Sequence, residues 1–468
     1  MTLHESNTYD LIAIGSGPAG RRAAVQAAKL GKRAAVVERE VALGGVSTNT
    51  GTLPSKTLRA AIVDLTARAE SVRSQEITID DLLWRTQQVI EHEREVIHDQ
   101  LRRNGVTVLE GTASFLSPYA LDVRGANARH IVVGRNIVIA VGTRPSRPPS
   151  VDFDDRTVVD SDGILSLARI PRTLTVVGAG VIGLEYASMA VKLGVRVTLV
   201  DKRASMLAFV DDELVEALQY HLRGLGMTIR LGETVEAVQR VDGVGAMTRL
   251  ASGELIRSDA VLYAAGRHGA TAQLVLGAAG LDADARGRIS VDAQLRTAQR
   301  HIFAAGDVIG FPSLAASSME QGRLAALAAF DQPSECTDDL LPYGIYTLPE
   351  ISFVGSNERE LAAANVPYVA GRASYRELPR GEMAGDRAGL LKLLVHSRTR
   401  QIVGVHIFGT AATELVHLGQ AVIAGSLGVD YLAESVFNVP TFSDAYKVAA
   451  LDAVARLDEL GGRIGRAA

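Results

Sequence analysis

The sequence predicts an α/β protein with two nucleotide-binding β-α-β units followed by a separate C-terminal α/β domain. Glycine-rich turns at residues 15–20 and 178–183 each follow a short apolar run and precede a helical pattern. Past residue 341 the composition changes to strand-like runs that are followed by helices. A chain of 468 residues is also too long for a single hydrophobic core. Together these observations indicate two Rossmann-like dinucleotide-binding domains and one further domain.

The first β-α-β unit lies at the N-terminus. An apolar run at residues 9–14 leads into the glycine turn, a helical pattern and a strand-like run that ends at Glu38. In such turns the first glycine permits the tight bend, the second lets a pyrophosphate approach the backbone, and the third lets helix and strand pack closely. The phosphates then bind the N-terminal amides of the helix, and the closing acid accepts hydrogen bonds from ribose. We expect these roles for Gly15, Gly17, Gly20 and Glu38.

The second unit repeats the pattern over residues 174–201 and is expected to bind a second dinucleotide. Its closing acid, Asp201, suits the free 2′-hydroxyl of NAD(H), whereas the cations that follow, Lys202 and Arg203, could accommodate the 2′-phosphate of NADP(H). We therefore predict a pocket that accepts both cofactors. The alternative is that the two cations are solvated surface charges beside an NAD-specific acid. The glycines of this turn are Gly178, Gly180 and Gly183.

The composition argues against several kinds of partner and site. A net charge of −4 with no basic stripe predicts no nucleic-acid partner, and no apolar stretch approaches the roughly 20 residues of a membrane span. The polar N-terminus predicts no signal peptide. Cys336 is the single cysteine, which rules out an intrachain disulfide and fits a reducing cytoplasm. No metal site is expected, because isolated histidines such as His268, His396, His406 and His417 form no metal-type cluster.

Further motifs resemble segments of the flavin disulfide reductases, flavoproteins with two dinucleotide sites. Residues 139–145 resemble their crossover motif, residues 264–267 the segment near the nicotinamide, and residues 302–307 the second FAD motif, whose aspartate binds the ribityl chain. The resemblance covers nearly the whole chain. It implies that the first unit binds FAD, that the second binds NAD(P), and that the C-terminal α/β domain is a dimerisation domain of a homodimer or higher homo-oligomer.

On this resemblance we expect a defined set of cofactor-binding residues. Those for FAD are Gly15, Gly17, Gly20, Glu38, Gly44, Gly45, Ser47, Thr52, Lys56, Gly111, Gly142, Asp307 and Ala315. Those for NAD(P) are Gly178, Gly180, Gly183, Glu185, Asp201, Lys202, Arg203, Val235 and Gly266. Lys56 and Glu185 resemble the family's ion pair beside the flavin, where a cation near N5 stabilises negative charge. The alternative is an ordinary buried salt bridge with a structural role.

The expected domains are an FAD-binding domain at 1–150, an NAD(P)-binding domain at 151–267, a return segment at 268–340 and an interface domain at 341–468. Paired apolar residues at seven-residue spacing within 64–104 predict long amphipathic helices that pack one face inward, with an interaction surface as the alternative. The proline-rich residues 144–149 predict a stiff crossing between domains.

The segment at residues 44–56 resembles the family's redox-active stretch, in which two cysteines stand five positions apart before Pro-Ser-Lys. Here Ser47 and Thr52 occupy those positions, and a hydroxyl cannot take part in thiol–disulfide exchange. The family's C-terminal histidine–glutamate pair is replaced by Val439 and Asp444, and valine cannot transfer a proton. The resemblance therefore predicts a disulfide-reductase scaffold that cannot reduce a disulfide.

Residues 203–211, 344–352 and 438–451 resemble the transhydrogenase branch of the family, which also has threonine at the second cysteine position but keeps a cysteine where this chain has Ser47. We predict an FAD-dependent NAD(P)⁺ transhydrogenase that moves hydride between NADPH and NAD⁺ by a ping-pong mechanism through flavin N5. Two alternatives stay open: an NAD(P)H oxidase or quinone reductase on the same scaffold, and a non-catalytic NAD(P)H-sensing module.

Overall fold

The computed structural model describes residues 7–71, 78–126, 128–241, 243, 245–333 and 340–467. Cys336 and the first six residues, on which two of the predictions rest, lie outside the described residues. The chain forms two compact units: unit 1 comprises Met1–Ile170 and Ala264–Cys336, and unit 2 comprises Pro171–Tyr263 and Thr337–Ala468. Over the described ranges, no helix is both long and apolar enough to cross a membrane.

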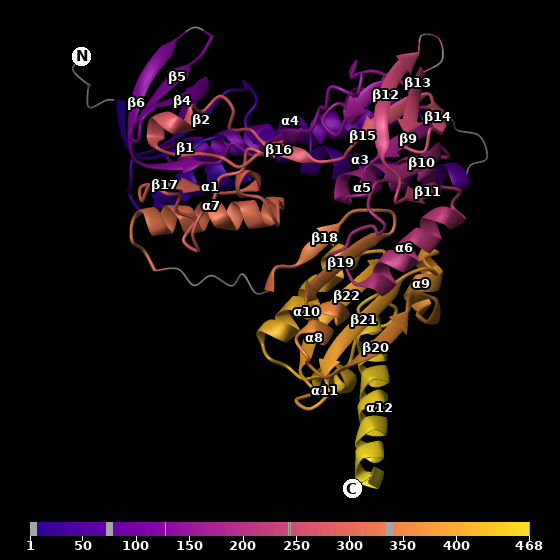
Figure 1. The fold of residues 1–468 in the computed structure, drawn as a ribbon. Helices are drawn as coiled ribbons and strands as arrows, with labels where there is room; N and C mark the ends of the chain where they lie inside the picture. The colour runs from indigo at the N-terminus through magenta and orange to yellow at the C-terminus, as the bar shows by residue number, and fades with distance from the viewer. Residues whose placement is uncertain are drawn as a thin grey trace. The chain divides into compact units, whose positions relative to one another are not determined.

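Unit 1 contains the first glycine turn (Figure 1). Its helices and strands are β1 (Thr8–Ile14), α1 (Pro18–Lys29), β2 (Ala34–Glu38), α2 (Gly45–Asn49), α3 (Thr52–Ser71), α4 (Ile79–Arg103), β3 (Thr107–Glu110), β4 (Thr112–Ser117), β5 (Ala120–Arg124), β6 (Arg129–Ile139), β7 (Thr143–Pro145), β8 (Val158–Asp160), β16 (Arg267–Gly269), β17 (Ile302–Ala304) and α7 (Ala315–Ala329).

The main sheet of unit 1 has the strand order β3-β2-β1-β6-β5-β4, and β17 also pairs with β6. The strands β1, β2, β3, β6 and β17 run parallel, whereas β4 and β5 pair antiparallel. Helices α1 and α7 lie side by side, and a Cβ on Gly322 would lie 2.0 Å from the carbonyl oxygen of Ala19 (Figure 1). This close packing places the middle of α7 beside the N-terminal end of α1.

The long helices predicted within residues 64–104 are α3 and α4. Helix α4 begins with a capping box in which Thr78 and Asp81 exchange hydrogen bonds, and its Leu82 and Ile97 are buried, as an inward-facing stripe requires. The proline-rich crossing is only partly as predicted: Thr143–Pro145 forms β7, which pairs antiparallel with β16 inside unit 1. Proline is tolerated there because this two-stranded pairing leaves its position at a sheet edge.

Unit 2 contains the second glycine turn and the C-terminal sheet. Its helices and strands are β9 (Thr173–Val177), α5 (Val181–Lys192), β10 (Arg196–Asp201), α6 (Asp212–Gly224), β11 (Thr228–Leu231), β12 (Val235–Val241), β13 (Gly245–Leu250), β14 (Leu255–Ser258), β15 (Ala260–Tyr263), β18 (Tyr343–Ile345), β19 (Glu350–Gly355), α8 (Glu358–Ala363), β20 (Tyr368–Ser374), α9 (Pro379–Ala384), β21 (Leu390–His396), β22 (Ile402–Gly409), α10 (Ala412–Ala424), α11 (Val429–Glu434) and α12 (Asp444–Ala467).

Three sheets organise unit 2. Strands β11-β10-β9-β15 are parallel, as a Rossmann-like unit requires, and β12-β13-β14 form an antiparallel sheet. The C-terminal sheet has the order β18-β19-β22-β21-β20 and is antiparallel throughout. Helix α12 packs closely on β20, since a Cβ on Gly371 would lie 2.1 Å from the carbonyl oxygen of Ala449. The predicted α/β fold class is confirmed.

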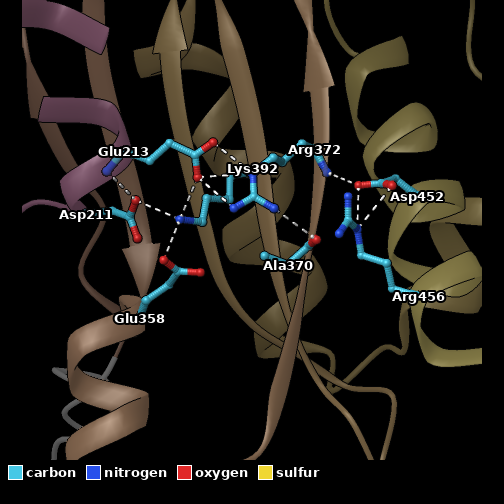
Figure 2. Close-up of polar contacts among 8 residues, drawn as sticks. All are labelled: Asp211, Glu213, Glu358, Ala370, Arg372, Lys392, Asp452 and Arg456. Atoms are coloured by element: carbon cyan, nitrogen blue, oxygen red, sulfur yellow. Dashed lines mark hydrogen bonds and ion pairs between the residues drawn. The ribbon is translucent and has the colours of Figure 1, made fainter. Parts of the chain in front are cut away.

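A fully buried lysine joins α6 to the C-terminal sheet. The Lys392 ammonium, on β21, lies 2.9 Å from Asp211 Oδ1, 3.0 Å from Glu213 Oε2 and 3.1 Å from Glu358 Oε2 (Figure 2). Arg372, its cross-strand neighbour on β20, donates to Glu213 at 2.8 Å. Burial opposes ionisation of Glu213, yet hydrogen bonds from Arg372 and Lys392 hold the pKa of its carboxyl below the usual range. The N-terminus of α6 is therefore held on the sheet by charge pairs around a buried cation.

We predict that Lys392→Met lowers the free energy of unfolding by about 3–5 kcal/mol, because three carboxylates lose the buried cation that they share. The loss of stability should be smaller at low pH. A carboxyl whose pKa is lower in the folded state stabilises the fold at pH values above its unfolded pKa, and this contribution disappears as the pH falls through its folded pKa. Denaturant unfolding at several pH values measures both effects.

The matched control is Arg387→Ala, which removes an ion pair with Glu382 whose two side chains are 71% and 60% exposed. Exposed pairs contribute little, so this variant should unfold like the parent. A Lys392→Met variant that was also as stable as the parent would show that the buried cluster does not stabilise the fold.

Candidate functional site

The first glycine turn has the backbone that close packing requires. Gly15 has φ +104°, and a Cβ there would lie 2.5 Å from the carbonyl oxygen of Ala140, at the end of β6. A Cβ on Gly20 would lie 1.9 Å from the carbonyl oxygen of Gly15, whereas a Cβ on Gly17 would meet nothing within 4 Å. Two glycines are therefore required by packing, and the middle one leaves open space next to the N-terminus of α1, where a phosphate fits.

Glu38, at the end of β2, is fixed by the turn itself. Its Oε2 accepts hydrogen bonds from the amide of Ser16 at 2.9 Å and from the Ser16 hydroxyl at 2.6 Å. Its Oε1 accepts from the amide of Glu40 at 3.1 Å. The Ser16 hydroxyl in turn accepts from the amide of Gly44 at 2.8 Å. One serine therefore connects the glycine turn, the acid and the start of the 44–56 segment.

Other predicted residues meet at the same edge of the sheet. The amide of Gly111, after β3, donates to the carbonyl of Glu38 at 2.7 Å. Gly142 follows β6, and a Cβ there would meet nothing within 4 Å. Asp307 follows β17. Between them, the amide of Ala305 donates to the carbonyl of Ile139 at 3.1 Å. The carboxyl ends of parallel strands are where dinucleotides bind in such sheets.

Asp307 has an environment suited to a ligand with hydroxyl groups. Burial raises the pKa of its carboxyl, against the opposing effects of the Arg267 guanidinium and the Thr143 hydroxyl. Thr143 donates to Asp307 Oδ2 at 3.4 Å, and Arg267 donates to the Thr143 hydroxyl at 2.9 Å and to its carbonyl at 3.0 Å. Because burial disfavours the charged form of this carboxyl, a polyol chain that donates further hydrogen bonds to it would be stabilising.

The remaining unit 1 residues lie on three helices. Gly45 begins α2, and a Cβ there would lie 3.0 Å from Gly17 Cα, so α2 starts against the glycine turn. Ser47 is on α2, Thr52 is the first residue of α3, and Lys56 on α3 donates to the hydroxyl of Ser55 at 3.3 Å. Ala315 is the first residue of α7, whose packing on α1 is described above.

The second glycine turn repeats the close packing of the first. Gly178 has φ +110°, and a Cβ on Gly183 would lie 1.9 Å from the carbonyl oxygen of Gly178, the same value as in the first turn. Gly180 is the N-cap residue of α5. Unit 2 therefore presents the N-terminus of α5 to an anion in the same way as unit 1 presents that of α1.

Asp201, at the end of β10, is bound differently from Glu38. Its Oδ2 accepts from the amide of Ala179 and from Arg203 Nη2, both at 2.6 Å. Its Oδ1 accepts from the amide of Arg203 at 2.8 Å and from Arg203 Nε at 3.0 Å. Burial would raise the pKa of this carboxyl, but the side chain and amide of Arg203 and the amide of Ala179 hold it below the usual range. Arg203 is thus paired with the predicted ribose-binding acid.

The other residues predicted for NAD(P) are divided between the units. Val235 begins β12, two residues after Glu233, whose amide donates to the carbonyl of Asp201 at 3.0 Å. Glu185 on α5 accepts from the amide of Tyr346 at 2.9 Å. Gly266 and Lys56 belong to unit 1 and Glu185 to unit 2, so the Lys56–Glu185 ion pair and the role of Gly266 stay predictions.

Comparison with known proteins identifies the family. Residues 9–322 match the pyridine nucleotide-disulphide oxidoreductase family, and residues 341–450 match the dimerisation domain of the same name. The chain belongs to the pyridine nucleotide-disulphide oxidoreductase family.

Relatives within this family carry a more specific name. The chain is 52% identical over 461 residues to the soluble pyridine nucleotide transhydrogenase of Mycobacterium tuberculosis. The match covers 97% of this chain and 98% of that protein. It is 43% identical to the protein of that name from Hahella chejuensis, over 96% of this chain and 99% of that protein.

Solved structures of the family have the same fold. LpdA of Mycobacterium tuberculosis superposes with a TM-score of 0.87 at 25% identity, over 94% of this chain and 99% of LpdA. The HOCl-induced flavoprotein disulfide reductase RclA of Escherichia coli superposes with a TM-score of 0.86 at 26% identity, over 95% and 99%. The predicted family is thus confirmed.

Over the described ranges, no group of three or more His, Cys, Asp or Glu residues could hold a metal ion.

Sequence reasoning missed residues whose roles depend on partners elsewhere in the chain. Ser16 lies inside the recognised turn, but its hydrogen bonds to Glu38 and Gly44 follow from the fold. Thr143 lies in the recognised crossover motif, yet its contact with Asp307 joins residues 164 positions apart. For Ser16, the sequence offers one signal, a polar residue within a glycine turn. For Thr143, the sequence offers no signal of its contact with Asp307.

We predict that Gly20→Ala and Gly183→Ala separate the two cofactor sites, because each adds a Cβ 1.9 Å from a backbone oxygen. Gly20→Ala should purify with little of the predicted FAD. Gly183→Ala should purify yellow but should not be reduced by NADPH. The absorbance of the flavin band, before and after NADPH, measures both.

The controls are Gly277→Ala and Gly224→Ala, where a Cβ would meet nothing within 4 Å and φ is ordinary. Both should keep flavin and its reduction. If Gly20→Ala retained full flavin, the first turn would not be an FAD site.

Proposed function

We propose that this protein is an FAD-dependent NAD(P)⁺ transhydrogenase, which moves hydride between NADPH and NAD⁺. One observation carries the proposal. The chain keeps both dinucleotide turns of its family, but it has Ser47 and Thr52 where a disulfide reductase has its two reactive cysteines. Hydroxyls cannot relay electrons to a disulfide. The name of the 52%-identical relatives, soluble pyridine nucleotide transhydrogenase, supports this proposal.

We assign the FAD site to the carboxyl edge of the unit 1 sheet. The N-terminal amides of α1, next to the open Gly17, would bind the pyrophosphate, and Glu38 and Asp307 would accept hydrogen bonds from the ribose and ribityl hydroxyls. FAD, when bound, supplies the centre that accepts and returns a hydride. The family name and the flavoprotein title of RclA support FAD and nicotinamide nucleotides as the cofactors.

We assign both nicotinamide nucleotides to one site in unit 2, built from the second glycine turn, Asp201, Lys202 and Arg203. The donor nucleotide leaves this site before the acceptor binds, which gives ping-pong kinetics. Following the family resemblance, Lys56 and Glu185 serve the reacting ends of the two cofactors, where a cation stabilises negative charge and the acid lies near the nicotinamide.

The proposed domains are those of the sequence: FAD binding at 1–150 with the return segment 268–340, NAD(P) binding at 151–267, and the interface at 341–468. The match to a dimerisation domain over residues 341–450 supports a homodimer, and a cytoplasmic location fits the nucleotide substrates.

We predict that anaerobic stopped-flow mixing with NADPH bleaches the flavin band and that a second mixing with NAD⁺ restores it, because electrons that cannot reach a protein thiol return through the nicotinamide site. Formation of NADH, followed in parallel, measures the transfer directly. The reduction and reoxidation should be independent steps, as expected of two nucleotides that share one site.

Two results would overturn the proposal. Reoxidation by oxygen or a quinone but not by NAD⁺ would make the protein an oxidase or quinone reductase. Stoichiometric reduction that no acceptor reversed would make it a non-catalytic sensing module.

We also predict no NADPH-dependent turnover of glutathione disulfide or lipoamide, because neither a thiol pair nor the histidine that would serve it is present. Ser47→Cys with Thr52→Cys should create a reducible pair, detected by thiol titration after NADPH, but turnover should stay low because Val439 cannot transfer a proton. Efficient disulfide turnover by the unaltered protein would refute the assignment.

A further inference from the structure

The acids that close the two β-α-β units accept hydrogen bonds from different donors. Glu38 accepts from three: the amide and hydroxyl of Ser16 on Oε2 and the amide of Glu40 on Oε1. Asp201 accepts from four, two on each oxygen, including both Nε and Nη2 of Arg203. A carboxylate has about four acceptor positions, so the described contacts fill those of Asp201 but not those of Glu38.

The donors on Asp201 are of two kinds. The amides of Ala179 and Arg203 are backbone groups fixed by the turn and the strand end, at 2.6 Å and 2.8 Å. The other two donors are the fork of one guanidinium, at 3.0 Å and 2.6 Å. A guanidinium fork matches the two oxygens of a carboxylate, and the 2′- and 3′-hydroxyls of a ribose present a similar pair of donors. The ribose of NAD(H) and the side chain of Arg203 therefore require the same two acceptor positions.

We propose that Arg203 masks Asp201 and that this ion pair sets the balance between the two nicotinamide nucleotides. NAD(H) must displace the guanidinium to reach the acid, whereas the 2′-phosphate of NADP(H) takes the guanidinium as its own partner. Arg203 therefore opposes one nucleotide and favours the other. This inference rests on the proposed function in one respect, that unit 2 binds both nucleotides at this turn.

Burial and position allow the pair to open. The Asp201 side chain is 5% exposed and stays in place, but that of Arg203 is 49% exposed and can move into solvent without leaving a cavity. Solvent screens the exposed part of the guanidinium, which weakens its hold on the acid. A Cβ on Gly180 would lie 3.9 Å from Arg203 Nη2, so the guanidinium lies beside the glycine at which the pyrophosphate is expected.

The pair opens by displacement and not by titration. Hydrogen bonds from Arg203 hold the pKa of Asp201 below its usual range against the effect of burial, and the hydrogen bonds to Asp201 raise the pKa of Arg203. Each group therefore favours the charged form of the other. The bound nucleotide alone decides which partner Arg203 has.

The test is equilibrium binding of NAD⁺ and NADP⁺ to the FAD-loaded protein by titration calorimetry. Arg203→Ala should tighten NAD⁺ roughly threefold to tenfold, because the acid no longer spends most of its time masked. The same variant should weaken NADP⁺ by roughly tenfold to a hundredfold through loss of a charged hydrogen-bond partner. Neither oxidised nucleotide reduces the flavin, so the result does not depend on transhydrogenation.

Two further variants separate masking from charge. Lys202→Ala removes the neighbouring positive charge; it should weaken NADP⁺ without tightening NAD⁺. Arg203→Lys keeps the charge but lacks the fork, so it should tighten NAD⁺ while keeping much of the NADP⁺ affinity. Flavin absorbance equal to that of the parent shows that each variant is folded and loaded.

If NAD⁺ bound Arg203→Ala and Arg203→Lys no more tightly than the parent, Arg203 would be a structural partner of Asp201 and the inference would fail. If NAD⁺ tightened as expected but NADPH-reduced flavin was not reoxidised by NAD⁺, the masking would stand and the proposed function would fail.

Discussion

Both β-α-β units depend on the close approach of the third glycine of the turn to the carbonyl oxygen of the first. In both units a Cβ at that position would lie 1.9 Å from a backbone oxygen, so helix and strand can meet only where no side chain exists. Everything else at the two sites is placed by this contact. It aims the amides of α1 and α5 at a phosphate, and it brings Glu38 and Asp201, at the ends of the following strands, next to Ser16 and Ala179. In each unit, therefore, the backbone amide that follows the first glycine donates a hydrogen bond to the closing acid.

The chemistry depends on what surrounds those turns. In unit 1 the 44–56 segment begins against the glycine turn, with Gly44 bound to Ser16 and Gly45 packed on Gly17. The disulfide reductases that this segment resembles have their two reactive cysteines there. With Ser47 and Thr52 in those positions, the same scaffold can bind the cofactor but cannot pass electrons onward through thiols. The chain lacks the thiol pair but keeps both glycine turns. This combination is expected of a protein that transfers hydride between nucleotides, and not of a disulfide reductase that has lost its function.

The parts of the structure that the sequence predicted are those with local causes. The glycine turns, their strands and helices, and the closing acids all lie within about 30 residues, and the family's motifs are contiguous. The parts that it did not predict join distant residues. Lys392 stands in an apolar run whose pattern predicts a buried strand, and its charge is satisfied by Asp211, 181 positions earlier. Strand β20 (Tyr368–Ser374) has a weak apolar pattern, because small residues such as Gly371 fill its inward positions, against α12.

Cofactor preference is a further property that the motif alone does not fix. Glu38 and Asp201 occupy the same place in the same motif, and each follows its third glycine by eighteen residues. They differ in the donors that the chain itself provides: a serine within the turn for Glu38, and an arginine two residues beyond the acid for Asp201. Ser16 leaves Glu38 with acceptor capacity for a ribose, whereas the fork of Arg203 takes up that capacity on Asp201. A single side chain outside the motif can therefore decide whether the closing acid is available to a ligand.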